Sequence, residues 1–440
     1  MDGLTLNPPA GLRAFEPSSR QAIGALVVIG VVTHLAMLLL FGDISMSANV
    51  WEYGEQARCA LRTGGDLCLT YFDGRTGHYP SAYVPPLLSY IWLGVMHLVG
   101  DTPAARGVIL GFNLVLSVAS PILAYTLARQ LRMSIFAALL GGLFLTLYPT
   151  FLYVVATYHQ TELAVFMGLA VAVLAAHALK EPEARLSTAI WLGVVSGLAT
   201  LNRTEMLLVC PVVITLIAIW RRSFRLFLVG GLAMALTLTP WVARNWLTFH
   251  HIIPGAQSSG YNIWKGFNPY TNGSGNLTEE QGGPGRVVFE RIYSETPASP
   301  TFETDLQAAY TAQLKIDLAE AGWRRLLQLS LNKVLLLWGL DWTDKGVTLT
   351  PAYLVPWAAM NALFLFGAVV AVRARTLDRG VTSICVVILG IVTAGFVATC
   401  VHARYRMHIE PFIFIIAALG AENILRRLTA MRGTRMRSAV

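Results

Sequence analysis

The chain has 440 residues, of which 55% are hydrophobic and only 13% are charged. Because soluble domains contain about 25% charged residues, this composition excludes a soluble globular protein, a disordered chain and a collagen-like fibre. The 33 basic and 25 acidic residues give a net charge of +8, which in a membrane protein is typical of cytoplasmic anchoring residues and not of nucleic-acid binding. We therefore predict an all-α polytopic integral membrane protein with about ten crossings.

The first apolar run that predicts a membrane-spanning helix extends from Gln21 to Gly42. Arg13 and Arg20 precede it and no small-residue cleavage site follows closely, so we expect an uncleaved signal anchor with a cytoplasmic N-terminus. The later runs, of which only the last contains charged residues, cover 79–100, 107–128, 133–161, 163–179, 186–202, 206–220, 226–243, 346–372, 380–401 and 407–425.

Basic residues gather in several links between these runs, and their positions predict the topology. The clusters are Arg129/Arg132, Lys180/Arg185, Arg221/Arg222/Arg225, Arg373/Arg375/Arg379 and Arg426/Arg427/Arg432/Arg435/Arg437. All of them fall inside if the run 79–100 and the amphipathic segment 323–342 lie along the outer membrane face without crossing. This arrangement gives about ten crossings of a bacterial cytoplasmic (inner) membrane, with both termini cytoplasmic.

The crossings are predicted to form a single membrane domain, 1–440, with two large extracytoplasmic loops. The first loop covers 43–106, and the second covers 245–350 and includes a predicted helix at 303–321. Residues 426–440 form a basic cytoplasmic tail. Since most connections are short, two long loops on one face, each with juxtamembrane helices, predict a functional site at the outer leaflet.

The first outer loop carries acidic residues that could act as a general base. Asp43 opens this loop, and Glu52 and Glu55 share one face of a predicted helix. A carboxylate in a partly dry cleft can have a raised pKa and take a proton from a substrate hydroxyl; a solvated helix face is the alternative. Cys59 and Cys68 could form a disulfide if the loop is extracytoplasmic, although the sequence does not fix the pairing.

Arg404 and Arg406 lie on the predicted outer side, against the positive-inside trend. Because a guanidinium group matches phosphate oxygens, we expect them to bind phosphate; anchoring to lipid headgroups is the alternative. Structural pairing is also the alternative role for the charged residues Glu162 and Arg203 at the membrane boundary. The other residues assigned to the phosphate or donor are Arg244, Lys265, His402 and Tyr405. The residues assigned to the substrate groove are Tyr53, Tyr83, Pro85, Pro86, Glu162, Arg203 and Trp264.

Short motifs in a consistent order cover most of the chain. They are Trp51-Glu52-Tyr53-Gly54 with Ala57, Pro85-Pro86-Leu87, the Gly100…Arg106 start of a crossing, Tyr125-x-Leu-Ala-Arg129, Glu162, Gly197-Leu-Ala-x-Leu-Asn-Arg203, Pro240-Trp-x-x-Arg244-Asn245, Gly260-Tyr-Asn-Ile-Trp-Lys-Gly266 and Arg404-Tyr-Arg406. Each motif is weak alone, but the ordered set resembles the GT-C membrane glycosyltransferases, in particular the bacterial protein-O-mannosyltransferase-like (family 39-like) branch.

This resemblance implies a polyprenyl-phosphate-sugar donor, an extracytoplasmic acceptor and a catalytic acidic residue in the first outer loop. Many relatives carry Asp or Asp-Glu where this chain has Asn49 and Val50. We therefore expect Glu52 to be the base, with Asp43 and Glu55 as rivals. The expected reaction is an inverting displacement in which basic residues hold the lipid phosphate.

Several alternatives remain at this point. The chain could be a transporter or lipid flippase, although it lacks the internal repeat typical of that class. It could also be a polysaccharide polymerase or ligase with a diphosphate-linked donor, or a scaffold for envelope assembly. No metal-ligand spacing is evident, so we expect no metal site and no required cofactor, with a divalent cation left open. The sequence names neither the sugar nor the acceptor, which could be a protein, a lipid or a glycan.

Overall fold

The computed structural model describes residues 17–69, 79–181, 183, 185–275, 283–340 and 350–437. Arg13, the start of the run 346–372 and the side chains beyond Met431 in the basic tail lie outside the described part. In chain order the elements are α2 (Ser19–Phe41), α3 (Trp51–Thr63), β1 (Cys68–Leu69), β2 (Tyr79–Pro80), α4 (Leu87–Val99), α5 (Pro103–Gln130), α6 (Ile135–Leu147), α7 (Pro149–Val154), α8 (Thr161–Lys180), α9 (Leu186–Asn202), α10 (Met206–Trp220), α11 (Phe224–Phe249), α12 (Ser259–Phe267), α14 (Pro284–Glu295), α15 (Phe302–Trp338), α16 (Pro351–Ala374), α17 (Arg379–Ala398), the 3₁₀ helix η1 (Ala403–His408) and α18 (Glu410–Arg437).

Six helices in the described part of the chain are long and apolar enough to cross a membrane: α2, α5, α8, α11, α16 and α17. Apolar side chains on several of them face outward, as Leu39, Leu232 and Val372 do with exposed fractions of 78%, 61% and 76%. Such exposure suits lipid contact and not water. The predicted all-α polytopic membrane fold is therefore confirmed. The apolar helices α6, α9 and α10 are shorter than these six, so the total of ten crossings stays a prediction.

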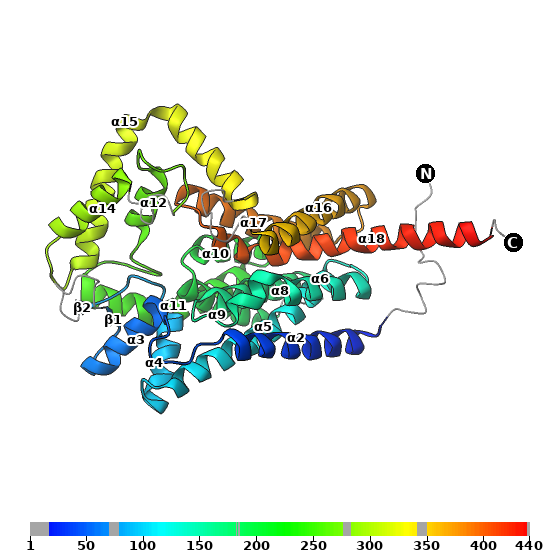
Figure 1. The fold of residues 1–440 in the computed structure, drawn as a ribbon, viewed down its shortest axis with the longest axis horizontal. Coiled ribbons are helices and arrows are strands. Elements are labelled where there is room, and N and C mark those ends of the chain that lie inside the picture. Colours follow the sequence, from blue (N-terminus) through cyan, green and yellow to red (C-terminus); the bar gives the residue numbers. More distant parts are fainter. Residues whose placement is uncertain are drawn as a thin grey trace.

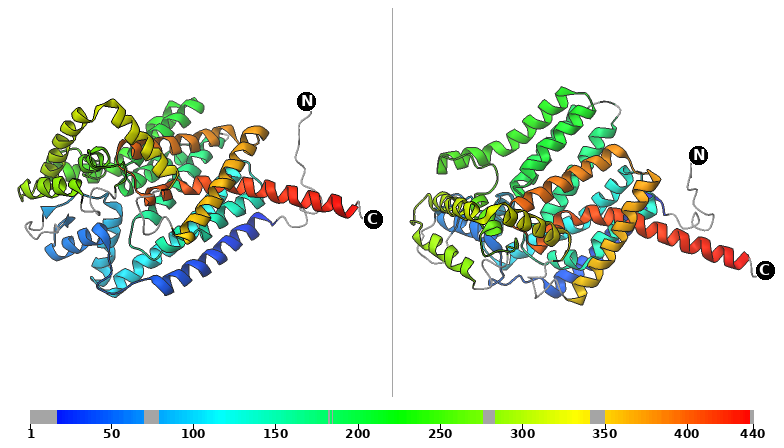
Figure 2. Two further views of the ribbon diagram at one scale, coloured as in Figure 1. Left: turned by 45° about the horizontal axis from the view of Figure 1, so that its top comes forward. Right: turned by 90° about the horizontal axis from the view of Figure 1, so that it is seen from above.

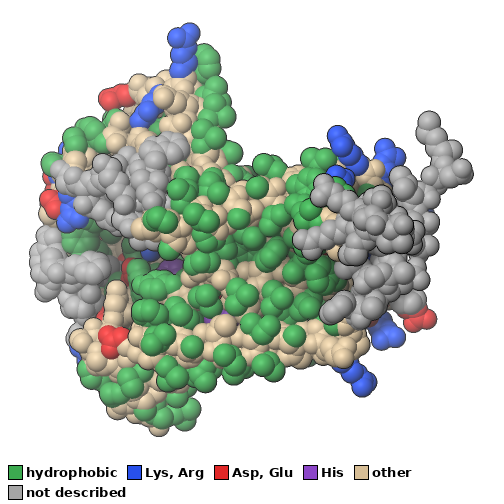
Figure 3. Space-filling model, turned by 45° about the vertical axis from the view of Figure 1, so that its right-hand side comes forward, with side chains coloured by type: hydrophobic (Ala, Val, Ile, Leu, Met, Phe, Trp, Pro, Cys, Tyr) green, Lys and Arg blue, Asp and Glu red, His purple; other side chains and the backbone are tan. Residues whose placement is uncertain are grey.

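The outer-loop elements and the ends of the helical bundle lie at opposite ends of the molecule. Figure 1 shows α3, α4, α12 and α14 at one end, and the start of α2 and the end of α18 at the other. The turned views in Figure 2 keep this division. In Figure 3 hydrophobic side chains cover the middle of the molecule, while Lys and Arg side chains lie toward its ends. This distribution matches an apolar belt between two aqueous sides.

Close helix packing in the bundle depends on glycine. A Cβ atom added at Gly193 of α9 would lie 2.2 Å from the Gly230 carbonyl oxygen of α11. A Cβ atom added at Gly367 of α16 would lie 2.1 Å from the Ile416 carbonyl oxygen of α18. Small residues at such contacts let helix backbones approach closely, which is the usual basis of packing inside a membrane.

Proline breaks two of the predicted runs, and glycine separates two predicted segments of the second loop. The run 133–161 is not one helix, because Pro149 ends the hydrogen-bond ladder of α6 and starts the short helix α7. The run 79–100 becomes helical only after Pro86. The element α15 contains the predicted helix 303–321 and most of the predicted segment 323–342, whose last two residues lie outside the described part. A kink at Gly322 (φ 68°) separates the two, at the predicted boundary. This backbone conformation favours glycine because it has no Cβ.

The two outer loops are joined by a buried polar network. The Glu303 carboxylate of α15 accepts hydrogen bonds from the Ser81 hydroxyl at 2.5 Å and from the Ala82 amide at 2.7 Å. The Gln56 amide of α3 donates to the same hydroxyl at 2.8 Å and accepts from the Ser89 hydroxyl of α4. Because a buried carboxylate needs such donors, this network fixes the loops against each other.

Candidate functional site

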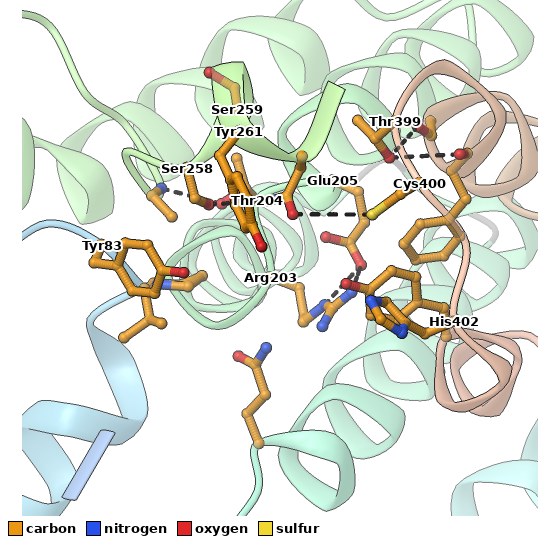
Figure 4. A pocket seen from close by; sticks show the side chains of 18 of the residues that line it. Tyr83, Arg203, Thr204, Glu205, Ser258, Ser259, Tyr261, Thr399, Cys400 and His402 are labelled. Atoms are coloured by element: carbon orange, nitrogen blue, oxygen red, sulfur yellow. Dashed lines mark hydrogen bonds and ion pairs between the residues drawn. The ribbon is translucent and has the colours of Figure 1, made fainter. Parts of the chain in front are cut away.

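A hollow of about 500 Å³ lies between the two outer loops and the outer ends of the bundle helices. It is bordered by α3, the segment after β2, the links before α8 and α10, α12, the end of α17, and η1. Figure 4 shows several of the side chains that line it. We call it the charged hollow, because its walls carry Glu52, Arg203, Glu205, Lys265 and Arg404.

Of the three acidic residues proposed as base, only Glu52 lines the charged hollow. Its side chain is partly buried on the first turn of α3, and nothing in the described part of the chain donates a hydrogen bond to its carboxylate. Glu55 instead forms an ion pair with Arg58 at 2.6 Å. Asp43 accepts from the Ser45 amide at 2.8 Å, and the hydrogen bonds from Ser45 hold its carboxyl pKa below the ordinary value.

Two of the predicted phosphate ligands, Lys265 and Arg404, lie in this hollow with His402 and Tyr405. The Arg404 guanidinium packs over the Trp51 ring at 5.5 Å and forms no ion pair with any residue in the described ranges. The Lys265 side chain is 5% exposed, and its amine lies 5.3 Å from the centre of the Tyr261 ring. Arg404 can therefore serve an anionic ligand, and Lys265 adds positive charge to the same hollow.

The structure does not bring Arg244 and Arg406 to the charged hollow. Arg244 pairs with Asp66 and donates to the Leu67 carbonyl oxygen at 2.9 Å. Arg406 is 3% exposed and pairs with Glu410 at 2.9 Å. Both guanidinium groups therefore bond to other parts of the protein and do not line the charged hollow.

Arg203 is fixed by contacts on several sides. Its Nη2 and Nε atoms donate to Oε1 of Glu205 at 2.6 and 2.7 Å. With the Gln160 amide oxygen turned toward them, Arg203 Nη1 and the Tyr53 hydroxyl both donate to it, at 2.9 and 2.7 Å. The guanidinium also packs against the Tyr405 ring at 5.4 Å. This arrangement places a rigid cation in the wall of the hollow.

Two histidines in the walls are held in the neutral state. His159 contacts Thr161 through Nδ1 at 2.7 Å. Burial, with the charges of Arg404 and Arg203, lowers its pKa well below the ordinary value. Burial and neighbouring cations lower the pKa of His402 in the same way. Positive charge in the hollow therefore resides on arginine and lysine.

The remaining predicted groove residues divide into two groups. Tyr53, Tyr83, Pro85 and Arg203 line the charged hollow, whereas Pro86, Trp264 and Glu162 do not. Trp264 is completely buried and donates to Asp317 at 2.9 Å. The sequence leaves Glu205 between structural pairing with Arg203 and a role in the site, and it assigns no site role to His159. The closeness of His159 to Glu162 in the chain was the available signal.

A second hollow of about 370 Å³ adjoins the first, and we call it the apolar hollow. Its walls include Pro149, Tyr153 and Val154 of α7 and Ala352 and Tyr353 of α16, with Met407. Trp51, His159 and Arg404 line both hollows. Trp51 has a positive φ of 56°, which is uncommon for a bulky residue and is a type of strain that concentrates at functional sites.

Cys59 and Cys68 are joined by a disulfide that links α3 to β1. No group of three or more His, Cys, Asp or Glu side chains that could hold a metal ion occurs in the part of the chain that the structure describes. The charged hollow combines carboxylates with arginine and lysine cations. Such a combination can accept a proton and stabilise an anion.

No protein-family model matches the sequence, and no curated protein sequence matches it. Solved structures do resemble it. One is the archaeal oligosaccharyltransferase AglB from Archaeoglobus fulgidus in complex with an inhibitory peptide and a dolichol-phosphate (12% identity, TM-score 0.52, 95% of this chain and 52% of that chain). A second structure of the Archaeoglobus fulgidus oligosaccharyltransferase, with Zn and sulfate, gives 14% identity and a TM-score of 0.55 over 94% of this chain and 51% of that chain.

ArnT from Cupriavidus metallidurans bound to undecaprenyl phosphate is also similar, with 14% identity and a TM-score of 0.42 over 91% of this chain and 77% of that chain. This chain spans about half the length of the oligosaccharyltransferases that it matches. At these identities the similarity establishes the fold. The chain shares its all-α, polytopic membrane fold with the matched part of these oligosaccharyltransferases.

Proposed function

We propose that the protein is a glycosyltransferase that moves a sugar from a polyprenyl-phosphate-sugar to an extracytoplasmic acceptor. One observation carries the proposal: Glu52, Lys265 and Arg404 share one hollow that adjoins an apolar one. The isoprenoid tail would occupy the apolar hollow. Its phosphate would lie at Arg404, which lines both hollows. A cleft with few convergent polar groups beside an apolar pocket suits such a ligand.

In the proposed reaction the Glu52 carboxylate takes the proton of the acceptor hydroxyl. The acceptor oxygen attacks the anomeric carbon, and the bond from that carbon to the phosphate oxygen breaks. The phosphate diester leaves as a monoester with one additional negative charge, which Arg404 and Lys265 stabilise. Attack opposite the leaving group inverts the anomeric configuration. A general base of this kind contributes roughly 10²–10⁴-fold to the rate. One electrostatic donor to the developing anion contributes roughly 10²–10³-fold.

The structural similarity supports a lipid-linked donor. The Archaeoglobus fulgidus oligosaccharyltransferase was solved with a dolichol-phosphate and an inhibitory peptide, so a protein of similar fold holds a lipid phosphate and a peptide. For this chain the proposal includes the protein-O-mannosyltransferase-like branch, a monophosphate donor and the bacterial inner membrane with cytoplasmic termini. It requires no metal ion, and it leaves the acceptor as a protein, a lipid or a glycan.

The test is transfer by the purified full chain in proteoliposomes, with polyprenyl-phosphate sugars as donors and membrane extract as the source of acceptor. Glu52→Gln keeps the size of the side chain but removes the base, so we expect the turnover number to fall by about 10²–10⁴-fold. Glu55→Gln is the matched control, because Glu55 lies one turn away on α3 and outside the hollow. We expect this control to keep most of the activity.

Equal activity of wild type and Glu52→Gln would refute the assignment of the base. Absence of sugar transfer by folded wild type with every monophosphate donor would refute the proposed function. In that case a diphosphate-linked donor in the same assay would test the polymerase or ligase alternative.

A further inference from the structure

Glu205 is a second carboxylate in the charged hollow, separate from the proposed base. It comes from the link between α9 and α10, whereas Glu52 comes from α3. Oε1 of Glu205 accepts from both Nε and Nη2 of Arg203, which fixes the carboxylate in position. No group in the described ranges donates to Oε2, and the side chain is 17% exposed. A rigid acceptor atom is therefore available to a ligand.

The surroundings of Glu205 are those of a sugar site. Figure 4 shows its carboxylate beside the Arg203 guanidinium, with Tyr261 and Cys400 on neighbouring walls. Ser258, Tyr261 and Asn262 add hydroxyl and amide groups, and the stacked rings of Phe396 and Tyr405 lie 4.7 Å apart in the wall beside Arg203. A sugar ring offers hydroxyl donors along its rim and apolar C–H groups on its faces. Carboxylates accept from the rim, and aromatic rings pack against the faces.

The two carboxylates would divide the chemistry of the proposed reaction. In the described part of the chain no cation is bonded to Glu52, the proposed base, whereas Glu205 is bonded to Arg203. Because both Arg203 donors are bonded to Oε1 of Glu205, its Oε2 is suited to accept a further hydrogen bond. Its oxygen therefore suits recognition of a hydroxyl group.

We propose that Glu205 is a specificity-determining residue that accepts a hydrogen bond from a ring hydroxyl of the transferred sugar through Oε2, with Arg203 holding it in place. This inference rests on the proposed function. A site built to bond a hydroxyl rejects an analogue that lacks it, because the partly buried acceptor is then left without a donor. Discrimination against the corresponding deoxy sugar follows.

The experiment compares wild type with Glu205→Gln in proteoliposomes. The donors are polyprenyl phosphate carrying mannose, glucose, galactose or a pentose, and then the monodeoxy analogues of the sugar that wild type transfers best. In Glu205→Gln the amide oxygen can still accept a hydrogen bond from Arg203. The second carboxylate oxygen, which is the proposed acceptor for the sugar hydroxyl, is replaced by an NH2 group that can only donate. Glu290→Gln, on the exposed side of α14, is the matched control. Binding of sugar-free polyprenyl phosphate to each protein is measured as well.

We expect wild type to disfavour one deoxy analogue by about 10²-fold or more in kcat/KM. Glu205→Gln should reduce this discrimination to within about tenfold and lose kcat/KM chiefly with the parent sugar. Its affinity for sugar-free polyprenyl phosphate should equal that of wild type, as should the thermal midpoint within a few degrees.

An equal loss with the parent sugar and with all deoxy analogues would overturn the assignment of Glu205, since it would indicate a general structural or catalytic role. Unchanged discrimination would overturn it too. If wild type neither binds nor turns over any sugar-bearing donor, the proposed function fails first and this inference fails with it. These outcomes are distinguishable because the first two require an active wild type.

Discussion

At the scale of single residues, the sequence does not predict which partners each arginine contacts. Arg244, Arg404 and Arg406 all lie on the predicted outer side. Only folding brings Asp66 to Arg244, and Tyr353 to Arg406. A guanidinium has five donors in a fixed fork, so carbonyls and carboxylates from distant segments can satisfy it without any ligand. Local motifs do not contain this information.

Arg404 provides the test of the phosphate assignment. Arg404→Ala should lower kcat/KM for the lipid-linked donor by about 10–100-fold, as expected for loss of a hydrogen bond to a charged group. Arg404→Lys should restore part of the activity, because it keeps the charge but not the fork geometry. Arg286→Ala on α14, outside the hollow, is the control. Full activity of Arg404→Ala would contradict the assignment.

Lys333 on α15 predicts a pH dependence of stability. Its side chain is completely buried, with the amine 3.1 Å from the Val397 carbonyl oxygen and over the Phe267 ring. Burial lowers its pKa to about 7, whereas an unfolded lysine titrates at about 10.4. Between these two pKa values the unfolded chain binds more protons at this residue than the folded chain does. The contribution of Lys333 to the free energy of unfolding therefore increases as the pH rises from about 7.

We therefore expect the thermal midpoint of wild type to gain from the Lys333 contribution between pH 7 and pH 9. Lys333→Met should remove that contribution and flatten the slope. Lys315→Met, an exposed position on the same helix, serves as control and should keep the wild-type slope. An identical pH dependence in Lys333→Met and wild type would show that the buried amine does not titrate in this range.

At the scale of elements, hydrophobic runs predicted the long helices well, since burial in lipid demands length and apolarity. The run 163–179 corresponds to α8 (Thr161–Lys180), for example. The ends and interruptions of helices are harder to predict from hydrophobic runs. The predicted run 133–161 includes Pro149, which separates α6 from α7 in the structure. The charged hollow combines segments that are spread along the chain from Trp51 to Tyr405, so motif order could suggest its members but not their geometry.

The disulfide between Cys59 and Cys68 predicts that α3 depends on an oxidising environment. It closes a loop of sequence separation 9 at the end of the helix that carries Glu52. In the chain-entropy model a loop of this size contributes about 2–3 kcal/mol. The double variant Cys59→Ser/Cys68→Ser should lower the thermal midpoint and reduce transfer. Dithiothreitol should lower the midpoint of wild type but not of the variant. Equal midpoints would mean that the network around Glu303 suffices.

At the scale of the whole molecule, the outer loops lie opposite the start of α2 and the end of α18 (Figure 1). The basic clusters predict which of these ends is cytoplasmic. Cysteine introduced at the exposed positions Glu295 and Arg222 tests this orientation. The three free native cysteines are buried, so a membrane-impermeant maleimide should report the new ones. Glu295→Cys should react in intact cells, and Arg222→Cys only after permeabilisation. The reverse pattern would invert the topology.

The meeting of the two hollows at Arg404 has a kinetic consequence for the proposed reaction. A lipid carrier whose tail occupies the apolar hollow reaches the site by lateral diffusion in the plane of the membrane. A water-soluble acceptor reaches it from the aqueous phase. The rate should then depend on the mole fraction of the carrier in the membrane and not on its bulk concentration in the assay. Doubling the lipid at fixed carrier should therefore slow an unsaturated reaction, although no bulk concentration of a reactant has changed.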